Sequence, residues 1–306
     1  MRLGVAAALV DGHRIAGDVA ITDGQVTAVG LQGAGSGLAA AGFVDLQVNG
    51  FAGVDFLSAD AGGYRRAGEA LAATGVTSYL PTFISSPVDA YWPALAQAHA
   101  ARAMAGGPRV VGVHLEGPFL SRQWAGAHDP ANILEPDLGL AAKLLDEGPV
   151  ILMTVAPERP GGLDLVTTLV RAGVVVSCGH TDADATTAHG AFDRGARSVT
   201  HVYNAQRRWR PRDPGVAGAG MCRTQVTVQA IVDGLHLAAE TAHQTFLAAR
   251  GRFALVTDAM EAAGLGDGDY WLGDRAVTVS GGAVRLADGT LAGSVLTLDA
   301  AVRNLV

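Results

Sequence analysis

The feature that most constrains the fold of this chain is a regular alternation of short apolar segments with helical ones. Eight apolar segments have the length and β-branched composition of buried strands: 43–48, 76–80, 110–115, 150–155, 173–178, 198–202, 226–232 and 253–257. Helical runs at 64–74, 164–173 and 184–195 lie between them. Such alternation predicts parallel strands with right-handed crossovers, and eight units close most economically into a (β/α)8 barrel of the TIM type.

The first 42 residues follow a different pattern. Short apolar pieces are separated by Asp11-Gly12 and by Asp23-Gly24, and Asp-Gly is a strong signal for a tight hairpin turn. We therefore predict a small antiparallel β domain over residues 1–42.

The barrel domain is expected over residues 43–306. A further hairpin with Gly281-Gly282 at its tip is predicted as an insertion at about 268–291. The chain then ends inside the helical run SVLTLDAAVRNLV.

Composition narrows the possible partners. A net charge of −7 without a basic stripe argues against nucleic acid, and no apolar run is long enough to cross a membrane. Cys178 and Cys222 form no CxxC pair, which agrees with a reducing, cytoplasmic location. Because Lys143 is the only lysine, Schiff-base, phosphate-loop or carbamylated-lysine chemistry would have to use that residue.

Polar side chains follow the apolar strands at the points where the strands end. These residues are Gln47, Asn49, Glu116, His180, His201, His236 and Asp258. Glu116 is the clearest example, since the apolar run VVGVHL leads into it and Gly-Pro ends the strand directly afterwards. The active sites of such barrels lie at the carboxyl ends of the strands, so we expect these side chains to gather at one rim.

A Glu with two His is a known ligand set for catalytic zinc, because three protein ligands leave one position for water. The alternatives are a polar barrel mouth that binds an organic ligand without metal, and a Glu116 that only caps the following loop. Asp258 ends the eighth strand, where it can face a metal-bound water. Its alternative role as a helix N-cap is weakened because no clear helix follows until about residue 295.

Seven segments, in this order, carry a family resemblance over essentially the whole chain: GFVDLQVNG, GVHLEGPFLS, CGHTDAD, THVYNA, VDGLH, LVTDA and LAGSVLTLDAAVRNLV. The sequence resembles the N-acetylglucosamine-6-phosphate deacetylases of the amidohydrolase superfamily. The resemblance implies a distorted barrel with a small β-sandwich domain and a homodimer. It also implies a phosphorylated amino-sugar substrate, whose acetamide is hydrolysed to give glucosamine 6-phosphate and acetate.

The resemblance also implies roles for single residues. Glu116, His180 and His201 match the ligands of one divalent metal ion, zinc by preference, with iron, cobalt, manganese or cadmium as alternatives. Asp258 matches the catalytic acid and base, and His128 matches a His that contacts the substrate's amide carbonyl. Positions that hold the sugar phosphate, some of them across a dimer interface, are matched by Asn204, Ala205, Arg212 and His236.

Most amidohydrolases carry His-x-His on the first strand for a second metal ion, whereas this chain has Gln47-x-Asn49. Amide side chains are poor ligands for a zinc-type ion. The sequence therefore resembles the one-metal branch of the superfamily, with the second slot vacant.

One departure from the family pattern concerns the substrate. After THVYNA the chain continues with QRRWRPR, which brings four arginines into residues 207–212. They form either a solvated loop or an enlarged anion site. An amidohydrolase acting on another N-acyl amino sugar or a cyclic amide is thus an alternative, as is an inactive, truncated homologue that binds metal or sugar phosphate without turnover.

In the resembled family, strands that arrive after the last barrel helix cover the N-terminal sheet. This chain ends at Val306, within that helix. We therefore expect an incomplete β-sandwich with an uncovered apolar face, and lower stability or solubility than in a full-length relative.

Overall fold

The computed structural model describes residues 1–306 apart from Ala34, and the chain forms two compact units, Met1–Phe43 and Val44–Val306. The sequence places this boundary near residue 42. Each unit is described by itself below.

The N-terminal unit is built from two hairpins. Strand β1 (Ala7–Val10) pairs with β2 (His13–Ala16) and with the short β5 (Leu38–Ala39), and β3 (Asp18–Thr22) pairs with β4 (Gln25–Leu31). Asp11-Gly12 and Asp23-Gly24 form the two turns, and all four residues have positive φ between 49° and 77°. This is the backbone that Asp-Gly favours, so the predicted hairpins are confirmed. Large apolar side chains such as that of Val26 are exposed in this unit.

The second unit is a parallel barrel. Its strands are β6 (Phe43–Val48), β9 (Val76–Ile84), β11 (Val113–Glu116), β12 (Val150–Val155), β13 (Val175–Cys178), β14 (Ser198–Val199), β15 (Thr227–Ala230) and β16 (Phe253–Leu255). They pair in chain order from β9 to β16, except that β6 pairs with β9 and β10 (Arg109–Val110) flanks β9. The ring closes where Asp258 N donates to Gln47 O at 2.9 Å and Asn49 N donates to Ala259 O at 2.7 Å. The predicted (β/α)8 fold is confirmed.

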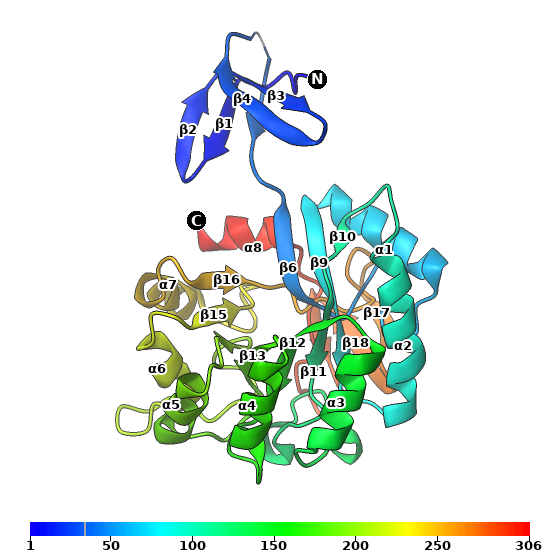
Figure 1. The fold of residues 1–306 in the computed structure, drawn as a ribbon, viewed down its shortest axis with the longest axis vertical. Coiled ribbons are helices and arrows are strands. Elements are labelled where there is room, and N and C mark those ends of the chain that lie inside the picture. Colours follow the sequence, from blue (N-terminus) through cyan, green and yellow to red (C-terminus); the bar gives the residue numbers. More distant parts are fainter. Residues whose placement is uncertain (34) are drawn as a thin grey trace. The chain divides into compact units, whose positions relative to one another are not determined.

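Helices cover the outside of the strands (Figure 1). They are α1 (Ala61–Ala73), α2 (Val88–Ala101), α3 (Leu138–Glu147), α4 (Gly162–Arg171), α5 (Ala185–Asp193), α6 (Gly215–Met221), α7 (Ala239–Ala248) and α8 (Leu298–Leu305). Side-chain caps fix the starts of several of them, and Asp60, Asp137 and Asp184 each accept a backbone N–H of the first turn. In the described residues no helix is long and apolar enough to span a membrane.

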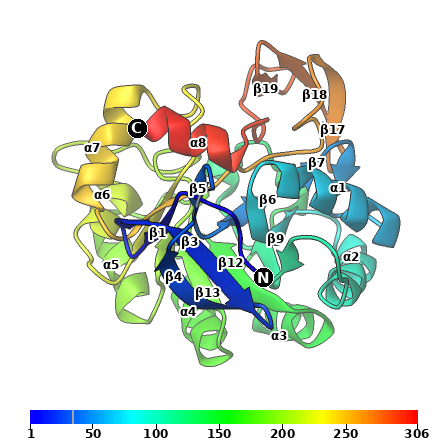
Figure 2. The ribbon, with the colours of Figure 1, turned by 90° about the horizontal axis from the view of Figure 1, so that it is seen from above.

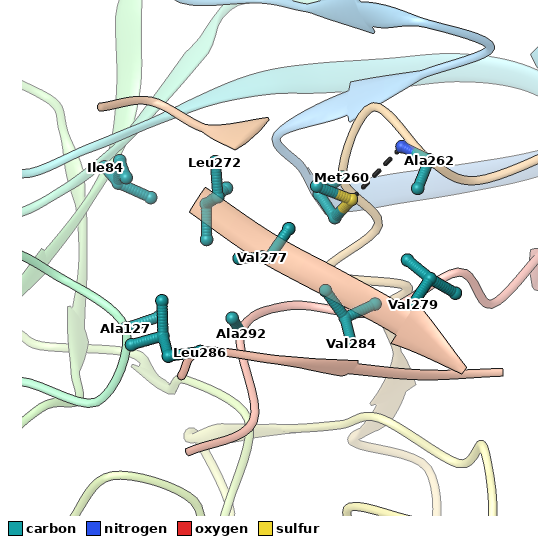
Figure 3. Packing of buried hydrophobic residues seen from close by; sticks show 10 residues of the cluster. All are labelled: Ile84, Ala127, Met260, Ala262, Leu272, Val277, Val279, Val284, Leu286 and Ala292. Carbon is teal, nitrogen blue, oxygen red and sulfur yellow. Dashed lines mark hydrogen bonds between the residues drawn. The ribbon is translucent and has the colours of Figure 1, made fainter. Parts of the chain in front are cut away.

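An insertion between β16 and α8 forms a three-stranded antiparallel sheet. It consists of β17 (Gly268–Leu272), β18 (Arg275–Ser280) and β19 (Ala283–Arg285), and it lies at the periphery of the barrel beside β7 (Gly50–Phe51), which pairs with β8 (Val54–Asp55) (Figure 2). Gly281 and Gly282 form the turn after β18, both at positive φ, as predicted. The inner face of this sheet packs on Met260 and on the end of β9 (Figure 3). The insertion thereby becomes part of the wall of the barrel mouth.

Candidate active site

Three candidate metal ligands meet at the carboxyl ends of the strands. Glu116 ends β11, His180 follows β13 and His201 follows β14, and each is at most 4% exposed. Glu116 Oε1 lies 3.2 Å from His180 Nε2 and 2.9 Å from His201 Nε2, and the two imidazole nitrogens are 3.1 Å apart. The structure brings together the residues that the sequence identifies as ligands, as a buried group able to hold a metal ion.

The chemistry of this group fits a cation. His180 Nδ1 lies 2.8 Å from Trp124 O, so Nδ1 carries the proton and the lone pair of Nε2 points at Glu116 and His201. Lone pairs that face a carboxylate at about 3 Å repel one another unless a positive charge lies among them. The edges of this triangle are close to those of a tetrahedral zinc site with bonds of about 2.1 Å, roughly 3.4 Å. His180 and His201 both have positive φ, 45° and 24°, and such strain is typical of functional residues.

Gln47 and Asn49, at the end of β6, act as hydrogen-bond donors in this site. Gln47 Nε2 donates to Glu116 Oε1 at 2.8 Å and to Asp258 Oδ1 at 3.1 Å, and Asn49 Nδ2 donates to Asp258 Oδ1 at 2.7 Å. Gln47 thus links the two carboxylates by hydrogen bonds, and Asn49 gives Asp258 a second donor. This contact supports the interpretation of the slot as one without a second metal.

Asp258 follows β16 at a positive φ of 49° and is 8% exposed. Burial, together with the nearby Glu116 carboxylate, raises the pKa of Asp258 to about 6. Both amide donors go to Oδ1, so they leave the second carboxylate oxygen free to exchange a proton. A carboxyl group with a pKa near 6 can serve as a base and then as an acid close to neutral pH.

His128 presents a proton to the same place. Its Nδ1 accepts from Ser85 N at 3.0 Å, so the proton is on Nε2, which lies 3.4 Å from Glu116 Oε2. Burial, reinforced by the nearby His180, lowers the pKa of His128 to about 4. His128 is therefore a neutral N–H donor at neutral pH.

These groups face one cavity of about 530 Å3. Besides Glu116, His128, His180, His201 and Asp258, its lining includes Asn49, Ile84, Trp124, Ala127, Asn204, Ala205, Arg208, His236, Leu272, Arg285 and Leu291. The volume falls in the range of small-molecule sites. Of the predicted substrate-binding residues, Asn204, Ala205 and His236 line the cavity, whereas Arg212 is exposed and does not.

The arginine-rich loop separates into residues with different surroundings. Arg207 Nε lies 2.9 Å from both carboxylate oxygens of Asp213, and its Nη1 lies 3.2 Å from Asp182 Oδ2. Arg207 therefore anchors the loop and is not available to a ligand. Arg208 lines the cavity and forms no ion pair with any residue that the structure describes. Sequence reasoning had no signal to single out Arg208 among the four arginines.

Comparison with known proteins is consistent with this site. The sequence is 36% identical over 285 residues to N-acetylglucosamine-6-phosphate deacetylase of Lysinibacillus sphaericus, covering 90% of this chain and 72% of the relative. It is also 36% identical over 268 residues to N-acetylgalactosamine-6-phosphate deacetylase of Escherichia coli O157:H7, covering 86% and 71%. The chain belongs to the N-acetylglucosamine-6-phosphate deacetylase family. No protein-family model matches the sequence.

A solved structure from this family is also similar over nearly the whole chain. It is a mutant of N-acetyl-D-glucosamine-6-phosphate deacetylase from Mycobacterium smegmatis, in complex with N-acetyl-D-glucosamine-6-phosphate. The TM-score is 0.94 at 34% identity, and the match covers 99% of this chain and 82% of that one. The family fold therefore extends over both units described above.

Proposed function

We propose that this chain hydrolyses the acetamide of N-acetylglucosamine 6-phosphate to glucosamine 6-phosphate and acetate, as a step of amino-sugar catabolism. The observation that carries the proposal is one cavity that unites the Glu116, His180 and His201 group with Asp258 and the His128 N–H. Amide hydrolysis needs an activated water, a proton for the departing nitrogen and a donor for the oxyanion, and this cavity has a residue for each task.

The metal-ligand group provides for the activated water. A divalent ion held by Glu116, His180 and His201 would supply a bound water of lowered pKa and polarise the amide carbonyl. Zinc suits this N, N, O set best, and iron, cobalt, manganese and cadmium are the alternatives.

Asp258 and His128 perform the remaining proton chemistry. The Asp258 carboxylate accepts the proton of the attacking water and then gives it to the amine nitrogen as the C–N bond breaks. His128 Nε2 donates a hydrogen bond to the carbonyl oxygen as negative charge develops on it, a contribution of about 3–4 kcal/mol for a well-placed donor. Gln47 and Asn49 hold Asp258 in place through their bonds to Oδ1.

The sugar phosphate belongs on the side of the cavity formed after β14 and β15. Asn204, Ala205, Arg208 and His236 line it there, and His236 is oriented by Asp233 Oδ2 at 2.7 Å from its Nδ1. Arg208 supplies the positive charge that a phosphate requires. Arg212 is exposed, and we propose that it serves the site of a neighbouring subunit in a cytoplasmic homodimer.

A second candidate substrate is N-acetylgalactosamine 6-phosphate, because a relative named for that sugar matches at the same identity. Acetate release should be measured with both phosphorylated epimers and with unphosphorylated N-acetylglucosamine. We expect N-acetylglucosamine 6-phosphate to be the preferred substrate and the unphosphorylated sugar to react poorly. Preference for the galactosamine epimer would reassign the substrate, and absence of acetate release from all three would refute deacetylation.

A further inference from the structure

The lining of the cavity is divided between two opposite sides of the barrel mouth. Asn204 and Arg208 follow β14, the sixth strand of the ring, and His236 follows β15, the seventh. Ile84 ends β9, the second strand, which lies across the ring from β14. Leu272 ends β17 of the insertion, and the insertion packs against this same second strand. The first side is polar and cationic. On the second side Ile84 and Leu272 form an apolar patch, and Arg285 at the end of β19 also lines the cavity there, with its Nη1 donating to Gly289 O at 2.7 Å.

The apolar part of this second side forms a well-packed wall. Ile84, Ala127 and Leu272 belong to one buried cluster with the inner face of the insertion, and they lie together at one end of it (Figure 3). They line the cavity, yet only 5–8% of their surface is exposed. Because the rest of each side chain is packed against the cluster, it has little room to move away from a ligand. Gly273 supports this wall, since a Cβ at that position would lie 3.2 Å from Ile84 Cδ1.

This wall is tied to the group that meets the amide carbonyl. Ser85, the residue after Ile84, donates its backbone N–H to His128 Nδ1, and Ala127 directly precedes His128. Ile84 and Ala127 are therefore the chain neighbours of the two residues in this hydrogen bond. Because of this adjacency, we take a carbonyl held by His128 Nε2 to lie beside the wall.

The geometry of the amide decides which end of the substrate meets the wall. A secondary amide is planar and trans, so its acyl chain and its nitrogen substituent point in opposite directions. With the sugar phosphate toward Arg208, the acyl chain points across the ring toward Ile84 and Leu272. We infer that Ile84, Ala127 and Leu272 form an acyl slot that restricts the N-acyl group to acetyl. This inference rests on the deacetylase function proposed above.

The test is a series of N-acetyl-, N-propionyl- and N-butyryl-glucosamine 6-phosphate, with kcat/KM measured for each in the parent and in Leu272→Ala and Ile84→Ala. An extra methylene in a filled apolar pocket typically changes kcat/KM by about 10- to 200-fold. We therefore expect the parent to lose at least tenfold at each step of the series. Each variant should lower the ratio of kcat/KM for the acetyl compound to kcat/KM for the butyryl compound by tenfold or more, because it removes carbon atoms from the wall.

Val279→Ala is the matched control. Val279 is a buried member of the same cluster, but it does not line the cavity and lies away from Ile84 in the close-up (Figure 3). It should leave the acetyl-to-butyryl ratio at the parent value even if it lowers stability. The ratio of two substrates in one preparation does not depend on the fraction of folded enzyme, so partial unfolding cannot mimic the result.

The outcomes separate the slot from the deacetylase function. An active parent that hydrolyses the butyryl and acetyl compounds equally well, or variants with an unchanged ratio, would overturn the slot and leave the proposed function standing. A ratio altered equally by Val279→Ala would also overturn it. A parent inactive on all three compounds would overturn both proposals.

Discussion

Among single residues, Asp258 is the one on which the proposed mechanism depends most directly. Asp258→Asn is nearly isosteric, and its amide oxygen can still accept from Gln47 and Asn49, yet it cannot take up the proton of water. We expect kcat to fall by about 10²- to 10⁴-fold, the usual contribution of a general acid–base group, with metal content and melting temperature near the parent values. Steady-state kinetics with metal analysis on the same sample provide the measurement. Turnover close to the parent value would move the base to another residue.

Arg208 offers a second test at this scale. Arg208→Ala should raise KM for the phosphorylated sugar with little change in kcat, because a remote phosphate contact contributes equally to ground and transition states. The expected rise is roughly fivefold, since solvent screens an exposed charge. Arg210→Ala is the control, because Arg210 belongs to the same loop but does not line the cavity.

Arg212 can be tested in the same kinetic series. Arg212→Ala should also raise KM if a partner subunit brings this residue to the site, and sedimentation analysis of the parent would establish whether the dimer forms. Equal KM values for Arg208→Ala and Arg210→Ala would remove Arg208 from the phosphate site.

The contrast between ligands and arginines explains what could be predicted for the site. Glu116 ends a strand, and His180 and Asp258 lie two and three residues after one. Parallel strands deliver their carboxyl ends to one rim, so the local pattern was sufficient to predict these residues. The position of Arg208 depends on the ion pairs that Arg207 makes with residues elsewhere in the chain. No local sequence pattern shows which arginine faces the cavity. The sequence alone therefore allowed both a solvated loop and an anion site.

At the scale of elements, the seam that joins β6 to the end of β16 depends on Asp45. This fully buried side chain accepts hydrogen bonds from Thr257 Oγ1 at 2.5 Å and from Gln47 N at 3.2 Å. Burial raises the pKa of Asp45 to about 7, from about 4 in an unfolded chain. The group therefore favours folding fully below pH 4, and this contribution is lost as the pH rises through 7.

Asp45→Asn tests this linkage. The variant has no ionisable group at the seam, so its melting temperature should change less between pH 5 and pH 8 than that of the parent. Asp146→Asn, at an exposed position of α3, serves as the control and should follow the parent. If Asp45→Asn and the parent lost the same number of degrees over this interval, Asp45 would not be the titrating group.

The strands were easier to predict from the sequence than one of the helices, α6. All eight strands were predicted because their apolar runs are dense and bounded by turns. Helix α6 was not predicted, since its sequence GVAGAGM has the glycine content of a loop. The structure gives the reason for that composition: a Cβ at Gly220 would lie 2.7 Å from Val199 of β14. Close packing against a strand therefore outweighs local propensity here.

For the molecule as a whole, we expect one tightly held divalent ion per chain after dialysis. Chelation should lower the melting temperature, because it leaves the His180 lone pair facing a buried carboxylate and removes a ligand of the folded state. His180→Ala should lose the ion. His236→Ala should retain it, because His236 pairs with Asp233 outside the ligand group. Two equivalents per chain by elemental analysis would contradict the one-metal interpretation.

The division of the barrel mouth has a consequence for how substrate preference can change. The residues assigned to the phosphate and those assigned to the acyl chain stand on strands across the ring, so the two preferences form separate modules that mutation can alter independently. Free energies at sites that do not touch usually add within about 0.5 kcal/mol. Leu272→Ala combined with Arg208→Ala should therefore change kcat/KM by the product of the two single effects, and a large deviation would reveal coupling through the substrate. A scaffold with this property can acquire a new acyl specificity while keeping its sugar phosphate.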